Sequence, residues 1–382
     1  MVTGSDVVIA GGGLIGLACA AAIGARGGSV ILLDDRRPGE ASPAAAGMLA
    51  PSIERAGAAD AFADAARDRY PSYVEWLANA TGIDVPLNRQ GILQVAVSER
   101  GVRGLRRAMP DTARWLDRDA LRAAEPALAH ALGAVHHPFD GAVDNVVLIA
   151  ALEEVVRAWP VDRQRTAAVE VLLDEPRPGV RGADGVVHRG DRVIIAAGAW
   201  TPAIRGLPRA LPISPLRGQM LAFAGMSLEH VLFGPRGYIV PRAAHAGATR
   251  ETLIGATSEP VGFDPSLSEA ARRSLHQAGS EVIPALSAMQ PTRQWAGLRP
   301  VTPDLLPIIG PEPDDPRLVY ACGHSRNGIL LAPLTADCIA AVVLGERVPH
   351  DLSPFRPDRF PLGLASERGQ GRVAPGPVRR DR

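Results

Sequence analysis

The chain has 382 residues with 41 basic and 41 acidic side chains, and every basic one apart from histidine is an arginine. This length exceeds what one hydrophobic core usually organises, so we expect two domains. The balanced charge argues against a nucleic-acid-binding surface. No apolar run is long enough to cross a membrane, so we expect no membrane association.

The cysteines and the N-terminus indicate the compartment. Cys19, Cys322 and Cys338 lie in apolar or glycine-rich stretches without C-x-x-C spacing, which predicts neither a disulfide framework nor a zinc site. The first residues have no basic segment, and glycines interrupt their apolar stretch, so no signal peptide is predicted. We expect a cytoplasmic protein with reduced cysteines and no metal.

The N-terminal stretch has the order of a dinucleotide-binding βαβ unit. A short apolar strand, DVVIA, leads into the glycine loop GGGLIG at residues 11–16, a helix of small residues follows, and a second strand ends on Asp34. In such a loop Gly11 permits the tight turn, Gly13 lets the backbone approach a pyrophosphate, and Gly16 lets the helix pack on the strand. Asp34, about twenty residues further on, is placed to bind ribose hydroxyls. The pattern predicts a dinucleotide without distinguishing NAD from FAD.

The predicted elements in the middle of the chain change in character at residue 83. Small residues at 44–49 (AAAGML) fit a chain running beside a planar ligand, and equally an ordinary tight loop, before a helix predicted at 60–82. Strands and two short helices follow over 83–139, with Asp117 or Asp119 as a cap, and this mixture indicates an inserted second domain.

The remaining elements return to each domain in turn. An amphipathic helix is predicted at 145–160, and the buried strand RVIIAAGAW runs into a turn where backbone can approach a nucleotide. The closely spaced runs PLRGQMLAF, GYIVPR and TLIGAT suggest an antiparallel sheet, and Ser266 or Ser268 caps the next helix. The last helix follows the glycine-containing loop GHSRNG, so its N-terminus can face a ligand. Residues 361–382, rich in Gly, Pro and Arg, are predicted to be a disordered tail.

Seven motifs carry a family resemblance. GGGLIG, AAAGML, RVIIAAGAW, PLRGQM, GYIVPR, WAGLRPVTPD and GHSRNGILLAP, in this order, resemble the FAD-dependent amine oxidases of the D-amino-acid oxidase class, and more narrowly the glycine oxidases of thiamine biosynthesis. The resemblance implies an α/β fold in which a Rossmann-type FAD-binding domain carries an inserted, mainly antiparallel substrate domain. The FAD-binding domain is expected at 1–82, 140–215 and 296–360, and the substrate-binding domain at 83–139 and 216–295.

The resemblance also implies how FAD is held. The expected contacts are Gly11, Gly13, Leu14, Ile15 and Gly16 at the pyrophosphate, Asp34 and Asp35 at the ribose, Ala41 and Ser42 beside them, Val169 at the adenine, Ala46, Gly47 and Met48 at the isoalloxazine, and His324, Ser325, Arg326, Asn327, Gly328, Ile329 and Leu330 at its pyrimidine end. A helix N-terminus there would stabilise the negative charge of reduced flavin. Because WAGLRPVTPDLLPIIG contains no cysteine, the FAD is expected to be non-covalent.

Three residues are expected at the substrate. Arg299 can hold a carboxylate through two parallel hydrogen bonds, Tyr238 can donate to the same carboxylate, and Arg326 supports them. Two positions depart from the family pattern, which has glycine at Ala50 and histidine at Arg236. We expect the extra methyl to narrow access and the extra cation to favour substrates with a second acidic group.

The implied reaction is oxidation of glycine or a similar small amine to an imine by hydride transfer to FAD, with O2 reduced to H2O2. The imine would hydrolyse to glyoxylate and ammonia or feed the thiazole of thiamine. A D-amino-acid dehydrogenase or a sarcosine-type oxidase, an inactive flavin-binding scaffold and a nicotinamide dehydrogenase are the alternatives. The family resemblance further suggests a homo-oligomer, with a tetramer as one form.

Overall fold

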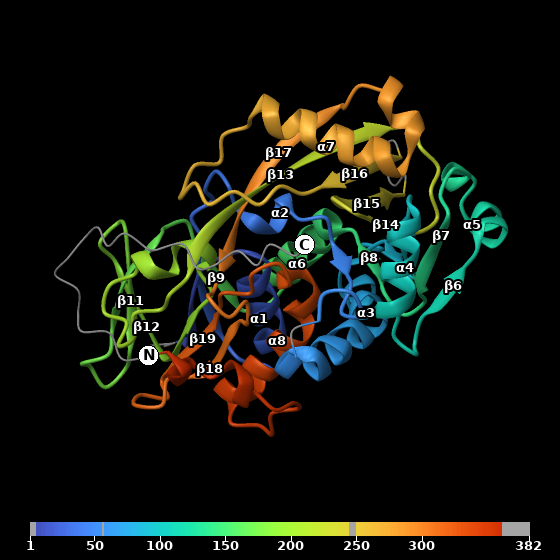
Figure 1. The fold of residues 1–382 in the computed structure, drawn as a ribbon. Coiled ribbons are helices and arrows are strands. Elements are labelled where there is room, and N and C mark those ends of the chain that lie inside the picture. The colour runs from blue at the N-terminus through green and yellow to red at the C-terminus, as the bar shows by residue number, and fades with distance from the viewer. Residues whose placement is uncertain (1–4, 56, 244–249, 361–382) are drawn as a thin grey trace.

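The computed structural model describes residues 5–55, 57–243 and 250–360, which are built around two eight-stranded sheets (Figure 1). The predicted tail, 361–382, lies outside the described residues. Helices cover both sheets, so the mixed α/β class expected from the sequence is confirmed. Among the described residues, no helix has the length and apolarity that crossing a bilayer requires.

The first sheet is largely parallel. In spatial order its strands are β10 (Ala168–Leu172), β11 (Gly179–Gly182), β12 (Val187–Ile195), β1 (Ser5–Ala10), β2 (Val30–Leu33) and β9 (Val161–Gln164), with β19 (Leu318–Cys322) joined to β12 and β18 (Ile308–Pro311) joined to β19. The pairs of β1 with β2, β1 with β12, β2 with β9, and β12 with β19 are all parallel. Their carboxyl ends therefore share one edge, which is where ligands bind in open parallel sheets.

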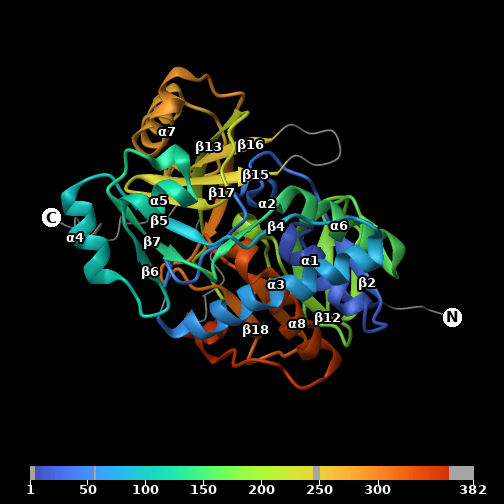
Figure 2. The ribbon, with the colours of Figure 1, turned by 90° about the vertical axis from the view of Figure 1, so that its right-hand side faces the viewer.

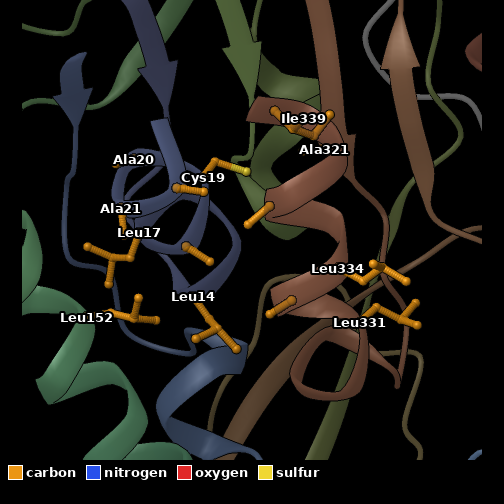
Figure 3. Packing of buried hydrophobic residues seen from close by; sticks show 14 of the residues in the cluster. Leu14, Leu17, Cys19, Ala20, Ala21, Leu152, Ala321, Leu331, Leu334 and Ile339 are labelled. Atoms are coloured by element: carbon orange, nitrogen blue, oxygen red, sulfur yellow. The ribbon is translucent and has the colours of Figure 1, made fainter. Parts of the chain in front are cut away.

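Four helices pack beside this sheet. They are α1 (Leu14–Gly24), α3 (Asp60–Thr81), α6 (Asn145–Ala158) and α8 (Gly328–Leu344). Helix α1 contacts both α6 and α8, and α3 lies across the same two helices (Figure 2). The buried alanines of α1 let its neighbours approach closely, and Figure 3 shows Leu17 and Cys19 of α1 in one cluster with Leu331 and Ile339 of α8. The first and last helices of the described chain thus share a core.

The second sheet is mainly antiparallel. Its order is β17 (Arg293–Val301), β13 (Ser214–Ala224), β16 (Glu251–Gly255), β15 (Gly237–Arg242), β14 (Val231–Gly234), β5 (Ile92–Ala96), β7 (Gly133–His137) and β6 (Arg114–Leu116), and β14 with β5 is a parallel pair. Side chains alternate across β13: Leu221 and Phe223 pack with helix α7 (Glu269–Val282), whereas Met220 and Ala222 face the opposite side. This opposite face looks toward the first sheet and forms part of the site described below.

Short elements complete the fold. They are α2 (Ala41–Ala44), α4 (Glu99–Ala108), α5 (Arg118–Ala124) and the small sheet of β3 (Met48–Leu49), β8 (Gly141–Val143) and β4 (Leu87–Asn88). The Asp117 side chain caps α5, and Ser268 rather than Ser266 caps α7.

Strand β17 differs from its expected place. It pairs with β13 along its whole length, from Arg293 opposite Ala222 to Val301 opposite Ser214. Residues 296–301 therefore hydrogen-bond within the second sheet, although we expected the first domain to resume at residue 296. The assignment of these residues to a domain depends on which strand they pair with, and local sequence does not reveal that pairing. We keep the division into two domains as a proposal, with β17 assigned to the second.

Candidate active site

A large cavity lies between the two sheets at the carboxyl ends of β1, β2, β12 and β19. Its walls come from the loops that follow these strands and from β13, β15 and β17 of the second sheet. The sequence-predicted site residues line this cavity except for Gly16, Leu330 and Arg236. Segments from both ends of the chain therefore meet in one place.

The glycine loop forms one end of the cavity, and its glycines differ in what surrounds them. Gly11 has φ +115°, and a Cβ on it would lie 2.5 Å from the carbonyl oxygen of Ala196. A Cβ on Gly16 would collide with the carbonyl oxygen of Gly11. At Gly13 the nearest atom to such a Cβ is the Ser42 hydroxyl, 3.4 Å away. Gly11 and Gly16 are thus needed by the protein itself, while Gly13 leaves room at the cavity wall for a ligand, as a pyrophosphate requires.

The N-terminus of α1 has a partner that the sequence did not indicate. Ser42 Oγ lies 3.1 Å from the backbone nitrogen of Leu14 and accepts its hydrogen bond. The capping position, Gly13, has no side chain to do this. Asn145 Nδ2 in turn donates to the backbone oxygen of Ser42 at 2.8 Å. One of the amides expected at a pyrophosphate is therefore already bonded within the protein.

Asp34 lies at the end of β2, where the sequence analysis expects a ribose. Its carboxylate is buried and accepts a hydrogen bond from Arg163 Nε on β9 at 3.0 Å. Its Oδ1 atom borders Gly12, where a Cβ would approach it to 2.5 Å. A carboxylate in this position can accept hydrogen bonds from hydroxyl groups. The exposed Asp35 carboxylate and Val169 line the same end of the cavity.

The segment Ala46 to Met48 forms the middle of the wall. Gly47 adopts φ +79°, and its carbonyl oxygen accepts a hydrogen bond from the backbone nitrogen of Val143 at 2.8 Å. A Cβ on Gly47 would collide with the Val143 carbonyl oxygen. Only glycine suits this position, because both the backbone angle and the close contact exclude a side chain.

The loop between β19 and α8 faces this segment across the cavity. Ser325 has φ +50°, and its backbone nitrogen donates to the Pro300 carbonyl oxygen at 3.0 Å, which ties the loop to β17. His324 is buried, with Nε2 3.2 Å from Thr335 Oγ1, and burial lowers its pKa to about 3, so the ring is neutral. The N-terminus of α8, beginning at Gly328, also lines the cavity and favours negative charge there.

Arg299 and Tyr238 meet at the other end of the cavity, each above a glycine of a neighbouring strand. The Arg299 guanidinium covers Gly218 of β13, where a Cβ would lie 2.5 Å from its Cζ, and its Nη1 donates to the Thr257 carbonyl oxygen at 3.0 Å. The Tyr238 ring covers Gly255 of β16 in the same way. Burial raises the pKa of the Tyr238 hydroxyl, so it remains a hydrogen-bond donor.

A partly buried carboxylate lies beside these two residues. Glu54 forms an ion pair with Arg326, and both line the cavity together with Ala50 and Met220. Burial raises the pKa of Glu54, and the nearby guanidiniums of Arg326 and Arg299 oppose that rise. This end of the cavity therefore holds two guanidiniums and one carboxylate.

Besides Gly16, two of the sequence-predicted site residues lie outside the cavity lining. Arg236 lies in the turn between β14 and β15, where it is exposed and donates through Nε to Glu281 of α7 at 2.8 Å. The expectation that Arg236 faces the substrate is corrected: the turn interrupts the strand alternation that would align it with Tyr238. The Leu330 side chain is buried in the core around α8, and the flavin contact expected from its backbone stays a prediction.

Several residues in or next to the cavity were not foreseen. Glu54 follows no motif, and its pairing with Arg326, 272 residues away, has no local signal. Gly218 and Gly255 stand inside the motifs PLRGQM and TLIGAT, but only the strand register shows which side chain each accommodates. Among the described residues, no group of three or more His, Cys, Asp and Glu side chains is arranged to hold a metal ion.

Comparisons with known proteins agree on one family. The DAO family model, described as FAD dependent oxidoreductase, matches residues 6–342. The bifunctional protein ThiO/ThiG of Synechocystis sp. is 36% identical over 376 residues, which cover 94% of this chain and 55% of that protein. The hydrogen cyanide synthase subunit HcnC of Pseudomonas aeruginosa is 32% identical, over 93% of this chain and 96% of the relative.

A solved structure shares the fold. The crystal structure of glycine oxidase from Geobacillus kaustophilus superposes with a TM-score of 0.85 and 30% identity, covering 92% of this chain and 98% of that one. This chain spans about half the length of the bifunctional relatives. The chain belongs to the DAO family of FAD-dependent oxidoreductases, with FAD as its cofactor.

Proposed function

We propose that the protein oxidises glycine, or a similarly small amino acid or amine, to the imine, with O2 reduced to H2O2. The imine then hydrolyses to glyoxylate, or the corresponding 2-oxo acid, and ammonia. The observation that carries this proposal is the meeting of Arg299, Tyr238 and Glu54 at one end of the cavity. FAD, when bound, supplies the two-electron acceptor for the hydride of the substrate carbon.

Arg299 is the carboxylate clamp in this proposal. A planar guanidinium binds a carboxylate through two parallel hydrogen bonds, which fixes the orientation of the substrate as well as its position. Gly218 leaves the guanidinium room to lie flat against β13, and the bond from Nη1 to Thr257 holds it there. The protonated Tyr238 hydroxyl donates to the same carboxylate. Met48, Ala50 and Met220 line the space beside them and favour a small substrate.

The charges at this end match a substrate with one carboxylate and a neutral amine. Arg299 and Arg326 contribute two positive charges and Glu54 one negative charge, so one positive charge awaits a partner. A free amino acid arrives with a protonated amine, which must lose its proton before hydride transfer. In this proposal solvent accepts that proton, because the charges balance only while Glu54 keeps its negative charge.

The residues that would hold FAD follow the length of the cavity. The glycine loop and the α1 N-terminus suit the pyrophosphate, Asp34 the ribose and Val169 the adenine end. Ala46, Gly47 and Met48, with the loop from His324 to Ile329, suit the flavin ring. Cys322 also lines the cavity, but burial raises its thiol pKa to about 12, so it stays protonated and unreactive, which supports non-covalent binding.

A second candidate function is the same amine oxidation with the electrons delivered to an acceptor other than O2, as in a D-amino-acid dehydrogenase, or with a different amine, as in a sarcosine-type oxidase. The similarity to HcnC, which carries another name than the glycine oxidases, keeps this candidate in view. The substrate end of the cavity suits both candidates, so the electron acceptor separates them.

An oxygen electrode and a peroxide assay test the proposal. Purified holoenzyme is supplied in air with glycine, sarcosine, D-alanine or iminodiacetate, and the flavin spectrum is followed separately without oxygen. Equimolar O2 consumption and H2O2 release with glycine support the proposal. Anaerobic flavin reduction with negligible O2 consumption supports the second candidate. A flavin that none of these amines reduces contradicts both.

We further propose that the imine supplies the thiazole of thiamine. The support is the similarity to the bifunctional ThiO/ThiG proteins. A strain that lacks the protein is expected to need thiazole or thiamine for growth, and growth without either would contradict this role.

A further inference from the structure

Two strands of the second sheet each carry a second residue on the same face as the expected substrate contact. Strand β15 carries Tyr238 and Arg242, and strand β17 carries Trp295 and Arg299. In both strands the two residues are four positions apart, so they lie on the same face, about 13 Å from each other along the strand. The substrate end of each strand is explained by the proposed function, whereas Arg242 and Trp295 are not.

Arg242 reaches the segment Ala46 to Met48 from β15. Its Nη2 donates to the Ala46 carbonyl oxygen at 3.0 Å and to Asn145 Oδ1, and its Nη1 donates to the Val143 carbonyl oxygen at 3.0 Å. The guanidinium is buried and forms an ion pair with Asp144 at 3.1 Å. Leaving a buried guanidinium partly unpaired is costly, so these partners fix its place firmly.

Its partners reach the same segment from the other side. The backbone nitrogen of Val143 donates to the Gly47 oxygen, and Met48 pairs with Ala142 in the small sheet. Asn145, which accepts from Arg242, donates to the Ser42 oxygen. Removing the Arg242 guanidinium would therefore disturb a connected network of hydrogen bonds along the cavity wall.

Strand β17 holds the preceding residues. Trp295 Nε1 donates to the Ala44 carbonyl oxygen at 3.0 Å, and the Leu298 nitrogen donates to the Gly39 oxygen at 2.8 Å. Gly297 lets α2 pack directly on the strand, since a Cβ there would lie 2.5 Å from the Ala44 Cβ. The residues from 39 to 48 are thus attached to both strands that carry the substrate contacts.

We propose that Arg242 and Trp295 are positioning residues that set the flavin-facing segment Ala44 to Met48 in register with Arg299 and Tyr238. This inference rests on the proposed function and on FAD as the cofactor. One strand then holds the substrate contact and the cofactor wall at a fixed separation, and misplacement by about 1 Å costs on the order of a hundredfold in rate.

Arg242→Met tests the inference, with Arg209→Met as its matched control. Arg209 is another buried arginine, paired with Glu312 at 2.8 Å, and it does not line the cavity. Three quantities are measured: the FAD dissociation constant of the apoprotein, the affinity of the holoenzyme for acetate from the flavin difference spectrum, and the anaerobic rate constant of flavin reduction by glycine.

The inference predicts a split between binding and reaction. In R242M, FAD binds at least tenfold more weakly and flavin reduction slows by about tenfold to a hundredfold, while acetate affinity stays within threefold because Arg299 and Tyr238 remain. R209M keeps all three values near those of the wild type. Equal behaviour of the two variants, or a loss of acetate affinity equal to the loss of rate, would overturn the inference.

Trp295→Phe is the second test variant, to be used if R242M does not fold. It retains an aromatic ring and removes only the donor to Ala44, so a smaller change in the same direction is expected in FAD affinity and reduction rate. Wild-type values in W295F would overturn the part assigned to Trp295. If no amino acid reduces the wild type, the proposed function fails. The FAD titration still tests whether Arg242 positions the segment Ala44 to Met48. Weaker FAD binding in R242M than in R209M supports this role, and equal binding overturns it.

Discussion

At the residue scale, the two proposed substrate contacts depend on residues that have no side chain. Arg299 lies over Gly218 and Tyr238 over Gly255, each pair on adjacent strands. A functional side chain that lies flat against a sheet needs a vacant position opposite it, because a Cβ would occupy the same space. Polar groups that would otherwise point into solvent are thereby held at the cavity wall, oriented before the substrate arrives.

Arg299→Ala is expected to lower kcat/KM for glycine by roughly 3–5 kcal/mol of transition-state stabilisation, since two charge-assisted hydrogen bonds are lost. Steady-state kinetics of the purified holoenzyme measure the effect. Arg273→Ala removes an exposed arginine of α7 that pairs with Glu269, and it should leave kcat/KM within about twofold. A loss smaller than tenfold in R299A would show that another group binds the carboxylate.

Asp140 is expected to make stability depend on pH. Its buried carboxylate, between β7 and β8, accepts from Ser52 Oγ at 2.9 Å, and burial raises its pKa from 3.8 to about 6. Because the folded protein holds this proton more tightly than the unfolded chain, its stabilising contribution is complete below about pH 4 and is lost as pH rises through about 6. The loss amounts to about 3 kcal/mol at most.

Urea unfolding at several pH values between 4 and 8 measures this effect. Asp140→Asn cannot titrate, so its free energy of unfolding should lack the fall that the wild type shows across this interval. Asp68→Asn, which removes an exposed carboxylate paired with the same Arg67, should keep the fall. Parallel curves for the wild type and D140N would contradict the assignment.

At the element scale, the loop before α1 combines structural and ligand-binding glycines within six residues. A Cβ on Gly16 would collide with the Gly11 carbonyl oxygen and displace α1 from β1, whereas a Cβ on Gly11 would collide with Ala196, just after β12. Gly13 is different, since it has φ −70° and no close neighbour on the side where a Cβ would project. Substitutions at Gly11 and Gly16 are therefore expected to destabilise the fold, whereas a substitution at Gly13 is expected to weaken ligand binding.

Gly13→Ala is expected to fold and to bind FAD poorly. Alanine adopts this backbone angle without strain. The free energy of unfolding of the apoprotein should therefore lie within about 1 kcal/mol of the wild-type value, the usual effect of a changed helix cap. FAD affinity should fall at least tenfold because the methyl group occupies the space of the pyrophosphate. Thermal unfolding and FAD titration measure the two effects. Gly16→Ala should instead destabilise the apoprotein strongly. Unchanged FAD affinity in G13A would contradict the role of Gly13 in leaving room for the pyrophosphate.

At the scale of the whole molecule, what could be predicted from sequence divides by distance along the chain. The glycine loop and the caps Asp117 and Ser268 were predictable because neighbours in sequence decide them. The pairing of Glu54 with Arg326 and the register of β13 with β17 were not, because each depends on where distant segments pack. Arg236 shows the same limit: its spacing from Tyr238 is right for one strand face, but the turn begins between them.

FAD should stabilise the entire described fold, because its cavity is bordered by both sheets. Ligand at a hundred times its dissociation constant adds about 2.7 kcal/mol to the free energy of unfolding, and the melting temperature should rise with FAD concentration. Differential scanning calorimetry of the apoprotein measures this rise. FMN, which lacks the adenylate half that suits the glycine loop, should have a much smaller effect at equal concentration. A melting temperature independent of FAD would contradict the shared cavity.

The contact between α1 and α8 has a consequence for synthesis of the protein. Arg26, just after α1, pairs with Asp337 of α8, and the two are 311 residues apart. At ribosomal rates, roughly 15–60 s pass between the emergence of one and the other. Throughout that interval the apolar side of α1 lacks its last neighbour and the cofactor cavity lacks a wall. We therefore expect FAD to bind only after α8 has been translated, and the exposed apolar side of α1 to make the nascent chain prone to aggregation until then.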